Sequence, residues 1–199
     1  MNRRRIEEKM FKRIASSIVE FLSNHGISPM SLTVSAFVAT IISSILYLYA
    51  SSNRLLYFPA AITLAISGFL DAVDGAVARR MNKSSKLGAF LDSVFDKLGE
   101  CFILIAIICS RAVDVLWGSM ALASSILVSY VRHRAEPLGV SLKGIGIMER
   151  AERIILLIIT SLMTPFMKDA LNYGIILIAV LTSITIAWRI IYTASRLKT

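Results

Sequence analysis

Cysteine and charged residues are both scarce in this sequence. Two cysteines in 199 residues exclude a disulfide scaffold and a cysteine-based zinc site. Charged residues make up 18% of the chain, against about 25% in an average globular protein. Hydrophobic residues make up 56% and the mean hydropathy is +0.69, which excludes a disordered chain. The formal net charge of +9 therefore lies in an apolar chain, which argues against a nucleic-acid partner.

The hydrophobic residues are gathered in runs long enough to cross a membrane. A spanning helix needs about 20 mostly apolar residues. A soluble helical core would need polar faces on most helices, and these runs have few polar residues. We expect an all-α fold, an integral membrane bundle of six transmembrane helices within residues 26–199. The six spans are expected close to residues 31–50, 55–70, 87–110, 115–132, 154–167 and 173–188.

Residues 1–25 have a different pattern. Between residues 6 and 22, charged side chains alternate with apolar ones such as Ile14 and Ile18. Glu20 and the lack of a small-residue cleavage site distinguish this segment from a signal peptide. We expect it to form an amphipathic helix on the membrane surface.

The lysines and arginines predict an orientation. With six spans, all but three of the 22 basic residues fall on one side of the membrane, and the exceptions are Arg54, Arg111 and Lys168. Cytoplasmic loops carry the excess of positive residues. We therefore expect a multi-pass protein of the cell membrane with both termini in the cytoplasm.

Four of the 13 acidic residues fall in one short window, at Asp71, Asp74, Asp92 and Asp96. The first two are three residues apart and the last two are four apart, so each pair shares a helix face. A helix–turn–helix would bring the pairs together, where they cannot all stay ionised without a counter-charge. Carboxylate oxygens suit Mg²⁺, Mn²⁺ or Ca²⁺.

The four aspartates also have two alternative roles. They could form ion pairs with the neighbouring basic residues, which are Arg79, Arg80, Lys83 and Lys97. They could also be the cation site of a divalent-metal transporter, although such a site should lie in mid-membrane rather than at the ends of spans beside basic residues.

The acids also belong to a longer motif. The sequence Asp71-x2-Asp74-Gly75-x2-Ala78-Arg79-x8-Gly88-x3-Asp92-x3-Asp96 resembles the signature of the CDP-alcohol phosphotransferase family at every fixed position. The resemblance implies a membrane transferase that moves a phosphate-linked group from a CDP-alcohol to a hydroxyl acceptor and releases CMP. It also implies a homodimer.

The same resemblance implies roles for individual residues. The expected ligands of Mg²⁺ or Mn²⁺ are Asp71, Asp74, Asp92 and Asp96, and Asp96 is also the expected catalytic base. The residues expected to bind the CDP group are Asp71, Asp74, Gly75, Ala78, Arg79, Gly88 and Asp92.

A second segment, residues 129–153, indicates the acceptor. It contains Ser-Tyr-Val-Arg-His-Arg-Ala-Glu followed by Met-Glu-Arg-Ala-Glu-Arg, which resembles the branch of the family that uses inositol phosphate. His133 takes a position that is more often small. Arginine suits a phosphate because its planar fork makes paired hydrogen bonds. The residues expected to bind the acceptor phosphate are Arg132, Arg150, Arg153 and Arg189.

These residues predict transfer of a diacylglycerol- or archaeol-phosphate group from a CDP-lipid to inositol phosphate. Glycerol phosphate or serine as acceptor, or CDP-inositol as donor, remain alternatives within the family. Simple pairing of Arg150 and Arg153 with Glu149 and Glu152, and of Arg134 with Glu136, is the alternative to a phosphate pocket.

Overall fold

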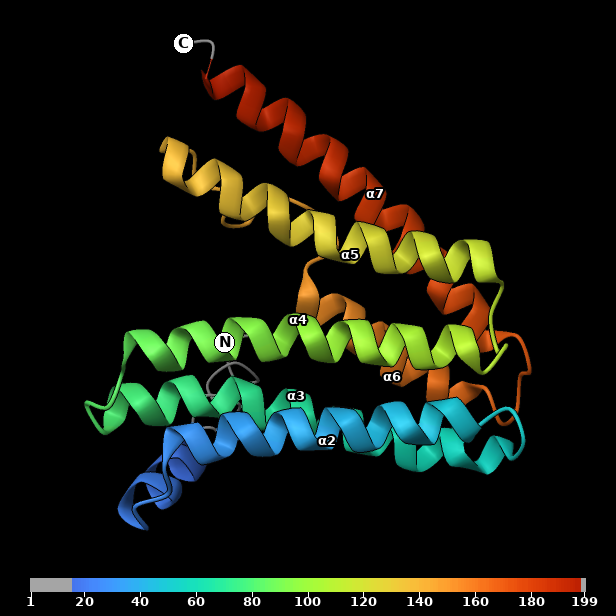
Figure 1. The fold of residues 1–199 in the computed structure, drawn as a ribbon, viewed down its shortest axis with the longest axis horizontal. Coiled ribbons are helices and arrows are strands. Elements are labelled where there is room, and N and C mark those ends of the chain that lie inside the picture. Colours follow the sequence, from blue (N-terminus) through green and yellow to red (C-terminus); the bar gives the residue numbers. More distant parts are fainter. Residues whose placement is uncertain (1–15, 198–199) are drawn as a thin grey trace, which may run out of the picture.

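The computed structural model describes residues 16–197, and this part of the chain contains helices and no strands (Figure 1). The expected all-α fold is thereby confirmed. The elements in chain order are α2 (Pro29–Tyr49), η1 (Arg54–Leu56), α3 (Tyr57–Arg80), α4 (Lys86–Cys109), α5 (Val115–Ala135), η2 (Glu136–Leu138), α6 (Arg150–Met163) and α7 (Ala170–Leu197).

Within residues 16–197, four segments are long and apolar enough to cross a membrane, which indicates a membrane protein. They are Pro29–Tyr49, Arg54–Arg80, Val115–Leu138 and Ala170–Leu197. Charged residues interrupt α4, and the 14 residues of α6 span only about 21 Å of a hydrocarbon core about 30 Å thick. The structure therefore supports four spans, and the expected count of six is not established.

Three expected segments have clearly different bounds, and one of them, 173–188, is extended at both ends as α7, Ala170–Leu197. The expected segment 55–70 continues as α3 to Arg80, because residues 71–80 keep the helical hydrogen bonding despite two aspartates. The expected segment 154–167 is α6, Arg150–Met163. It begins earlier because Glu149 and Glu152 form a capping box. It ends earlier because Pro165 has no N–H to donate to the next carbonyl, although Thr164 before it is still helical.

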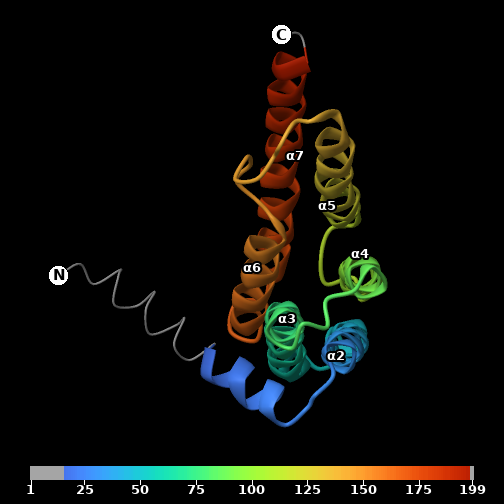
Figure 2. The same ribbon diagram turned by 90° about the vertical axis from the view of Figure 1, so that its left-hand side faces the viewer.

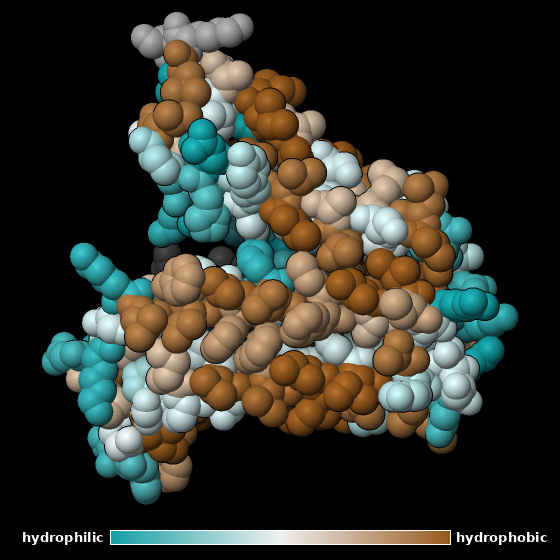
Figure 3. All heavy atoms as spheres, in the orientation of Figure 1, coloured by the Kyte–Doolittle hydropathy of each residue, from teal (hydrophilic) through white to brown (hydrophobic). Residues whose placement is uncertain are grey.

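The helices form two groups joined by α6. Helix α2 packs against α3 and α4, while α5 packs against α7, and α6 contacts both α3 and α7 (Figure 2). Hydrophobic side chains cover the middle of the visible surface and hydrophilic ones gather toward its two ends (Figure 3). This distribution fits a bundle whose middle lies in lipid.

Polar side chains join the helices inside the bundle. The Ser43 hydroxyl donates to the Ala60 carbonyl at 2.9 Å, and the hydroxyls of Tyr47 and Ser161 lie 2.7 Å apart. All of these groups are buried, and such interhelical bonds satisfy polar atoms that lipid cannot.

Residues 16–24 are helical and pack against α2 and α3. Val19 lies in a small apolar cluster with Leu32, Val73 and Val77, and Glu20 makes a 2.8 Å ion pair with Arg80 of α3. The remainder of the expected amphipathic helix, residues 1–15, lies outside the described part of the chain.

Close contact between α2 and α4 generates a first prediction. A Cβ at Gly99 would lie 2.8 Å from Cγ2 of Thr40, so Gly99→Ala should destabilise the protein by about 1–3 kcal/mol through overpacking. Thr40→Ser removes that methyl group and keeps the hydroxyl, so the double variant should recover most of the loss. Thermal unfolding in detergent measures both effects, and equal midpoints for the single and double variants would contradict this packing.

Candidate active site

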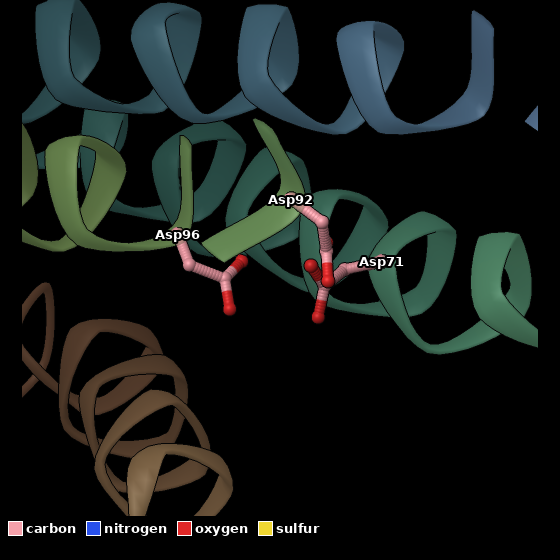
Figure 4. Close-up of side chains that lie close together, drawn as sticks. All are labelled: Asp71, Asp92 and Asp96. Atoms are coloured by element: carbon pink, nitrogen blue, oxygen red, sulfur yellow. The ribbon is translucent and has the colours of Figure 1, made fainter. Parts of the chain in front are cut away.

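Three carboxylates meet in the space between α3 and α4, which both pack against α2. Asp71 comes from α3, and Asp92 and Asp96 come from α4 (Figure 4). One carboxylate oxygen of each lies within 4.8 Å of the others, and all three side chains are half-buried. The helix–turn–helix predicted from the motif therefore brings these three acids together.

Asp74 points elsewhere. It is buried, and its Oδ2 accepts a 2.6 Å hydrogen bond from the Thr33 hydroxyl of α2. It does not belong to the three-carboxylate cluster in this structure. Thr33 is not among the residues predicted from the sequence, because nothing in its local pattern distinguishes it from the other hydroxyl residues of α2.

A cleft opens beside the cluster, between the start of α2, the end of α3 and the start of α4. Its cavity volume is about 420 Å³, which is the size of a small-molecule site. The lining includes most of the residues predicted to bind the CDP group, namely Asp74, Gly75, Ala78, Arg79, Gly88 and Asp92. Asp71 lines the narrow pocket next to it, and Asp92 lies in both.

Arg150 supplies the positive charge at the carboxylates. From the first turn of α6, its Nη1 donates to Asp71 Oδ2 at 2.7 Å, and its Nη2 lies 2.7 Å from Asp96 Oδ1. Its Nε is buried and makes no hydrogen bond with any residue that the structure describes. The alternative in which Arg150 pairs with Glu149 or Glu152 is therefore wrong.

The neighbouring basic residues do not neutralise the aspartates. Arg80 pairs with Glu20, and Lys97 pairs with Glu100 at 3.2 Å. Arg79 and Lys83 line the cleft and make no ion pair with a described residue. The alternative that the four acids are simply paired with adjacent basic residues is not supported.

Arg153 and Arg189 bind protein groups around Arg150. Arg153 is 2% exposed, and its Nε donates to Glu100 at 2.6 Å while its Nη1 donates to the Met148 carbonyl. Arg189 is equally buried and donates to the carbonyls of Ile145 and Val128 and to Glu149. These bonds fix the loop before α6. Glu100, like Thr33, is not among the predicted site residues.

Arg132 is more exposed than the other three arginines. It lies near the end of α5 and pairs with Glu136 at 2.8 Å. The alternative pairing of Arg134 with Glu136 is not found, because Glu136 pairs with Arg132. The structure thus brings Arg150 to the carboxylates. Arg153 and Arg189 bind the loop before α6 instead, and Arg132 lies at the end of α5.

The cluster fits a hard metal ion. Its donors are carboxylate oxygens, which bind Mg²⁺, Mn²⁺ or Ca²⁺ in preference to softer metals. Asp71, Asp92 and Asp96 are the residues that would hold such an ion.

The fold and the site define a helical membrane protein with a carboxylate cluster at the edge of a ligand-sized cleft. Comparison with known families gives the class, because residues 27–192 match the family described as CDP-alcohol phosphatidyltransferase. The chain belongs to the CDP-alcohol phosphatidyltransferase family and is a transferase. Membership in this enzyme family replaces the transporter alternative.

Two relatives with similar sequences carry the name of one enzyme. The chain is 40% identical to archaetidylinositol phosphate synthase of Pyrococcus horikoshii over 94% of each chain. It is 44% identical to the enzyme of that name from Methanothermobacter thermautotrophicus over 75% of each.

Solved structures agree in fold. Phosphatidylinositol phosphate synthase of Mycobacterium tuberculosis with CDP-DAG bound matches with a TM-score of 0.78 and 25% identity, covering 91% of this chain and 94% of that one. The same enzyme in complex with manganese and citrate has a TM-score of 0.77 at 24% identity, covering 90% of this chain and 88% of that one.

Metal binding is tested directly by titrating the purified protein with Mn²⁺ and following free Mn²⁺ by electron paramagnetic resonance. Asp92→Asn should weaken binding at least about tenfold, because one of three clustered carboxylates is lost. Asp169→Asn, at an exposed aspartate just before α7, should leave the affinity unchanged. Equal affinity for Asp92→Asn and the parent protein would contradict the site.

Proposed function

We propose that this protein transfers a lipid phosphate from a CDP-lipid to a hydroxyl of inositol phosphate and releases CMP. The product is phosphatidylinositol phosphate or its archaeol analogue. The observation that carries the proposal is the carboxylate cluster, which shares Asp92 with a ligand-sized cleft and receives Arg150 from α6. The names of the relatives support the same reaction.

We assign the CDP group to the cleft beside the cluster. Gly75, Ala78 and Gly88 line it with small side chains, while Arg79 and Lys83 offer positive charge to a pyrophosphate. The proposed CDP set also includes Asp71, Asp74 and Asp92. A solved structure of a relative of this fold contains CDP-DAG, which supports a CDP-lipid as the donor.

We assign the metal to Asp71, Asp74, Asp92 and Asp96. Bound there, Mg²⁺ or Mn²⁺ would supply positive charge to the pyrophosphate and to the departing CMP. Asp74 would join the set by releasing Thr33, whose hydroxyl now occupies its Oδ2.

Asp96 is the proposed base. Its carboxylate accepts the proton of the acceptor hydroxyl as that oxygen attacks the phosphorus that carries the lipid. The bond from this phosphorus to the bridging oxygen breaks, and the electron pair leaves with CMP. Positioning of the two substrates does most of the remaining work in phosphoryl transfer.

The acceptor phosphate is proposed to bind near Arg150, among the four arginines 132, 150, 153 and 189. Arg150 is the one in contact with the cluster, and its buried Nε has no partner among the described residues, so a phosphate that entered beside it would satisfy that donor. Arg153 and Arg189 already donate to protein groups, so their contacts favour a role in holding the α6 loop at the phosphate site.

The finer architecture is part of the proposal. We infer six spans, with α4 and α6 crossing beside the four apolar segments, and an amphipathic surface helix within residues 1–25. The excess of basic residues at the carboxylate end supports placing both termini and the site on the cytoplasmic side of the cell membrane. We also infer a homodimer, which the family resemblance implies.

A CMP-release assay with CDP-lipid and Mg²⁺ tests the reaction. Inositol phosphate should support release, whereas glycerol phosphate and serine should not, and a chelator should abolish it. Asp96→Asn should lower turnover at least about 100-fold, since it removes the base, whereas Asp169→Asn should not. Turnover by Asp96→Asn at the parent rate would refute the assignment of the base.

Arg150→Gln tests the acceptor site. Loss of a charge-assisted bond to phosphate should raise the KM for inositol phosphate about tenfold or more, with a much smaller change for the CDP-lipid. Arg196→Gln, at an exposed arginine near the end of α7, is the control. Equal increases in both KM values would count against a phosphate contact at Arg150.

A further inference from the structure

A second polar hollow lies at the end of the bundle opposite the carboxylates. The connections α2–α3, α4–α5 and α6–α7 meet there, at the right-hand end of Figure 1, where Figure 3 shows hydrophilic side chains. Each connection contributes one basic residue to the lining, and these are Arg54, Arg111 and Lys168. The empty space is about 950 Å³ including the open mouth.

The three basic residues are not neutralised by ion pairs. No ion pair among residues 16–197 involves Arg54, Arg111 or Lys168. Asp114 and Asp169 also line the hollow, but Asp114 Oδ1 accepts the N–H groups of Leu116 and Trp117 at the start of α5. Asp169 directly precedes α7, where the positive end of the helix dipole compensates a carboxylate.

The backbone at Arg111 adds a second observation. Its φ is +56°, in the left-handed region that a glycine adopts without strain. The chain turns sharply here, between Ser110 at the end of α4 and the start of α5. An arginine at such a position has a strained backbone, and residues with strained backbones cluster at functional sites.

Tyr57 adds a third observation. Its side chain lines the hollow and is only 3% exposed, yet its hydroxyl makes no hydrogen bond with any residue of the described chain. The hydroxyl is not among the buried side-chain atoms without a partner in the described part of the chain, so it reaches the open space of the hollow. The hollow therefore offers an unused hydroxyl next to three unpaired positive charges.

We propose that this hollow binds the phosphate group of a lipid at the membrane surface opposite the carboxylate site. Arginine forks and a lysine ammonium match a phosphate, and the Tyr57 hydroxyl donates to one of its oxygens. The hollow lies at the end of four membrane-length segments, where lipid phosphates are the abundant anions. A free phosphate ion shares this chemistry, and the experiment separates the two sources.

Trp117 reports on the site because it lies in the first turn of α5, hydrogen-bonded to Asp114 of the lining. In a Trp188→Phe background it is the only tryptophan. We would titrate the full-length protein in detergent and chelator with short-chain dihexanoylphosphatidate, with inorganic phosphate, and with dihexanoylglycerol, which lacks the phosphate. Dihexanoylphosphatidate should change the fluorescence of Trp117 saturably, and dihexanoylglycerol should not.

Two pairs of substitutions locate the binding. Arg111→Gly with Lys168→Gln should raise the half-saturating lipid concentration at least tenfold while the glycine relieves the strained backbone, so the thermal midpoint should not fall. If that pair fails to fold, Arg54→Gln with Lys168→Gln should give the same loss of binding with Arg111 kept. Arg196→Gln, at the other end of the molecule, should bind like the parent.

Each outcome of the titrations either supports or overturns the proposed phosphate site. Inorganic phosphate that saturates at the same concentration as the lipid, with the same loss in the variants, would support the phosphate site and identify the free ion as its ligand. Binding by the variants equal to that of the parent would overturn the proposal. An equal response to dihexanoylglycerol would overturn it too, since the phosphate would then contribute nothing.

Discussion

The repulsion among three aspartates is the constraint on which the site depends. Two ionised carboxylates whose oxygens lie within 4.8 Å of each other repel by at least about 3 kcal/mol at an effective dielectric constant of about 20. A whole domain is stable by only about 5–15 kcal/mol, so several such pairs cannot be left uncompensated. For all three to stay ionised, the bundle must therefore bring positive charge to α3 and α4, from a metal ion, from another helix, or from both in turn.

Arg150 meets this constraint, and much of the polar structure serves to place it. The capping box of Glu149 and Glu152 begins α6 at Arg150. Arg153 ties the same turn to Glu100 of α4, and Arg189 ties the preceding loop to α5 and α7. One arginine thus reaches two carboxylates through bonds that join four helices. In the proposed reaction, the same arginine lies where an acceptor phosphate would meet the base.

The sequence predicted the local chemistry better than the long-range contacts. The spacing of Asp71, Asp92 and Asp96 determines which helix face they share, and a short turn between helices leaves little choice of arrangement. The pairing of Arg150 with Asp71 joins residues 79 apart in the chain, and no local pattern encodes it. The bond of Thr33 to Asp74 and that of Glu100 to Arg153 are missed for the same reason, since each depends on how whole helices pack.

The predicted count of six spans is not established because two of the six helices, α4 and α6, do not qualify as membrane spans by themselves. Helix α4 carries the site's charges in its first half, so it lacks the composition of a free-standing span. Helix α6 is short because Pro165 follows it, so it lacks the length of one. Such helices are stabilised by neighbours rather than by lipid alone. Charge placement on the loops was informative in another way, because the three basic residues left on the far side meet in one hollow.

The central claim is that a metal ion and Arg150 compensate the same carboxylates. Anomalous diffraction from crystals grown with Mn²⁺ tests it most directly. We predict an anomalous peak about 2.0–2.6 Å from carboxylate oxygens of Asp71, Asp92 and Asp96, with Arg150 no longer bridging Asp71 and Asp96. A structure at saturating Mn²⁺ with no peak at these oxygens and Arg150 still bridging them would contradict it.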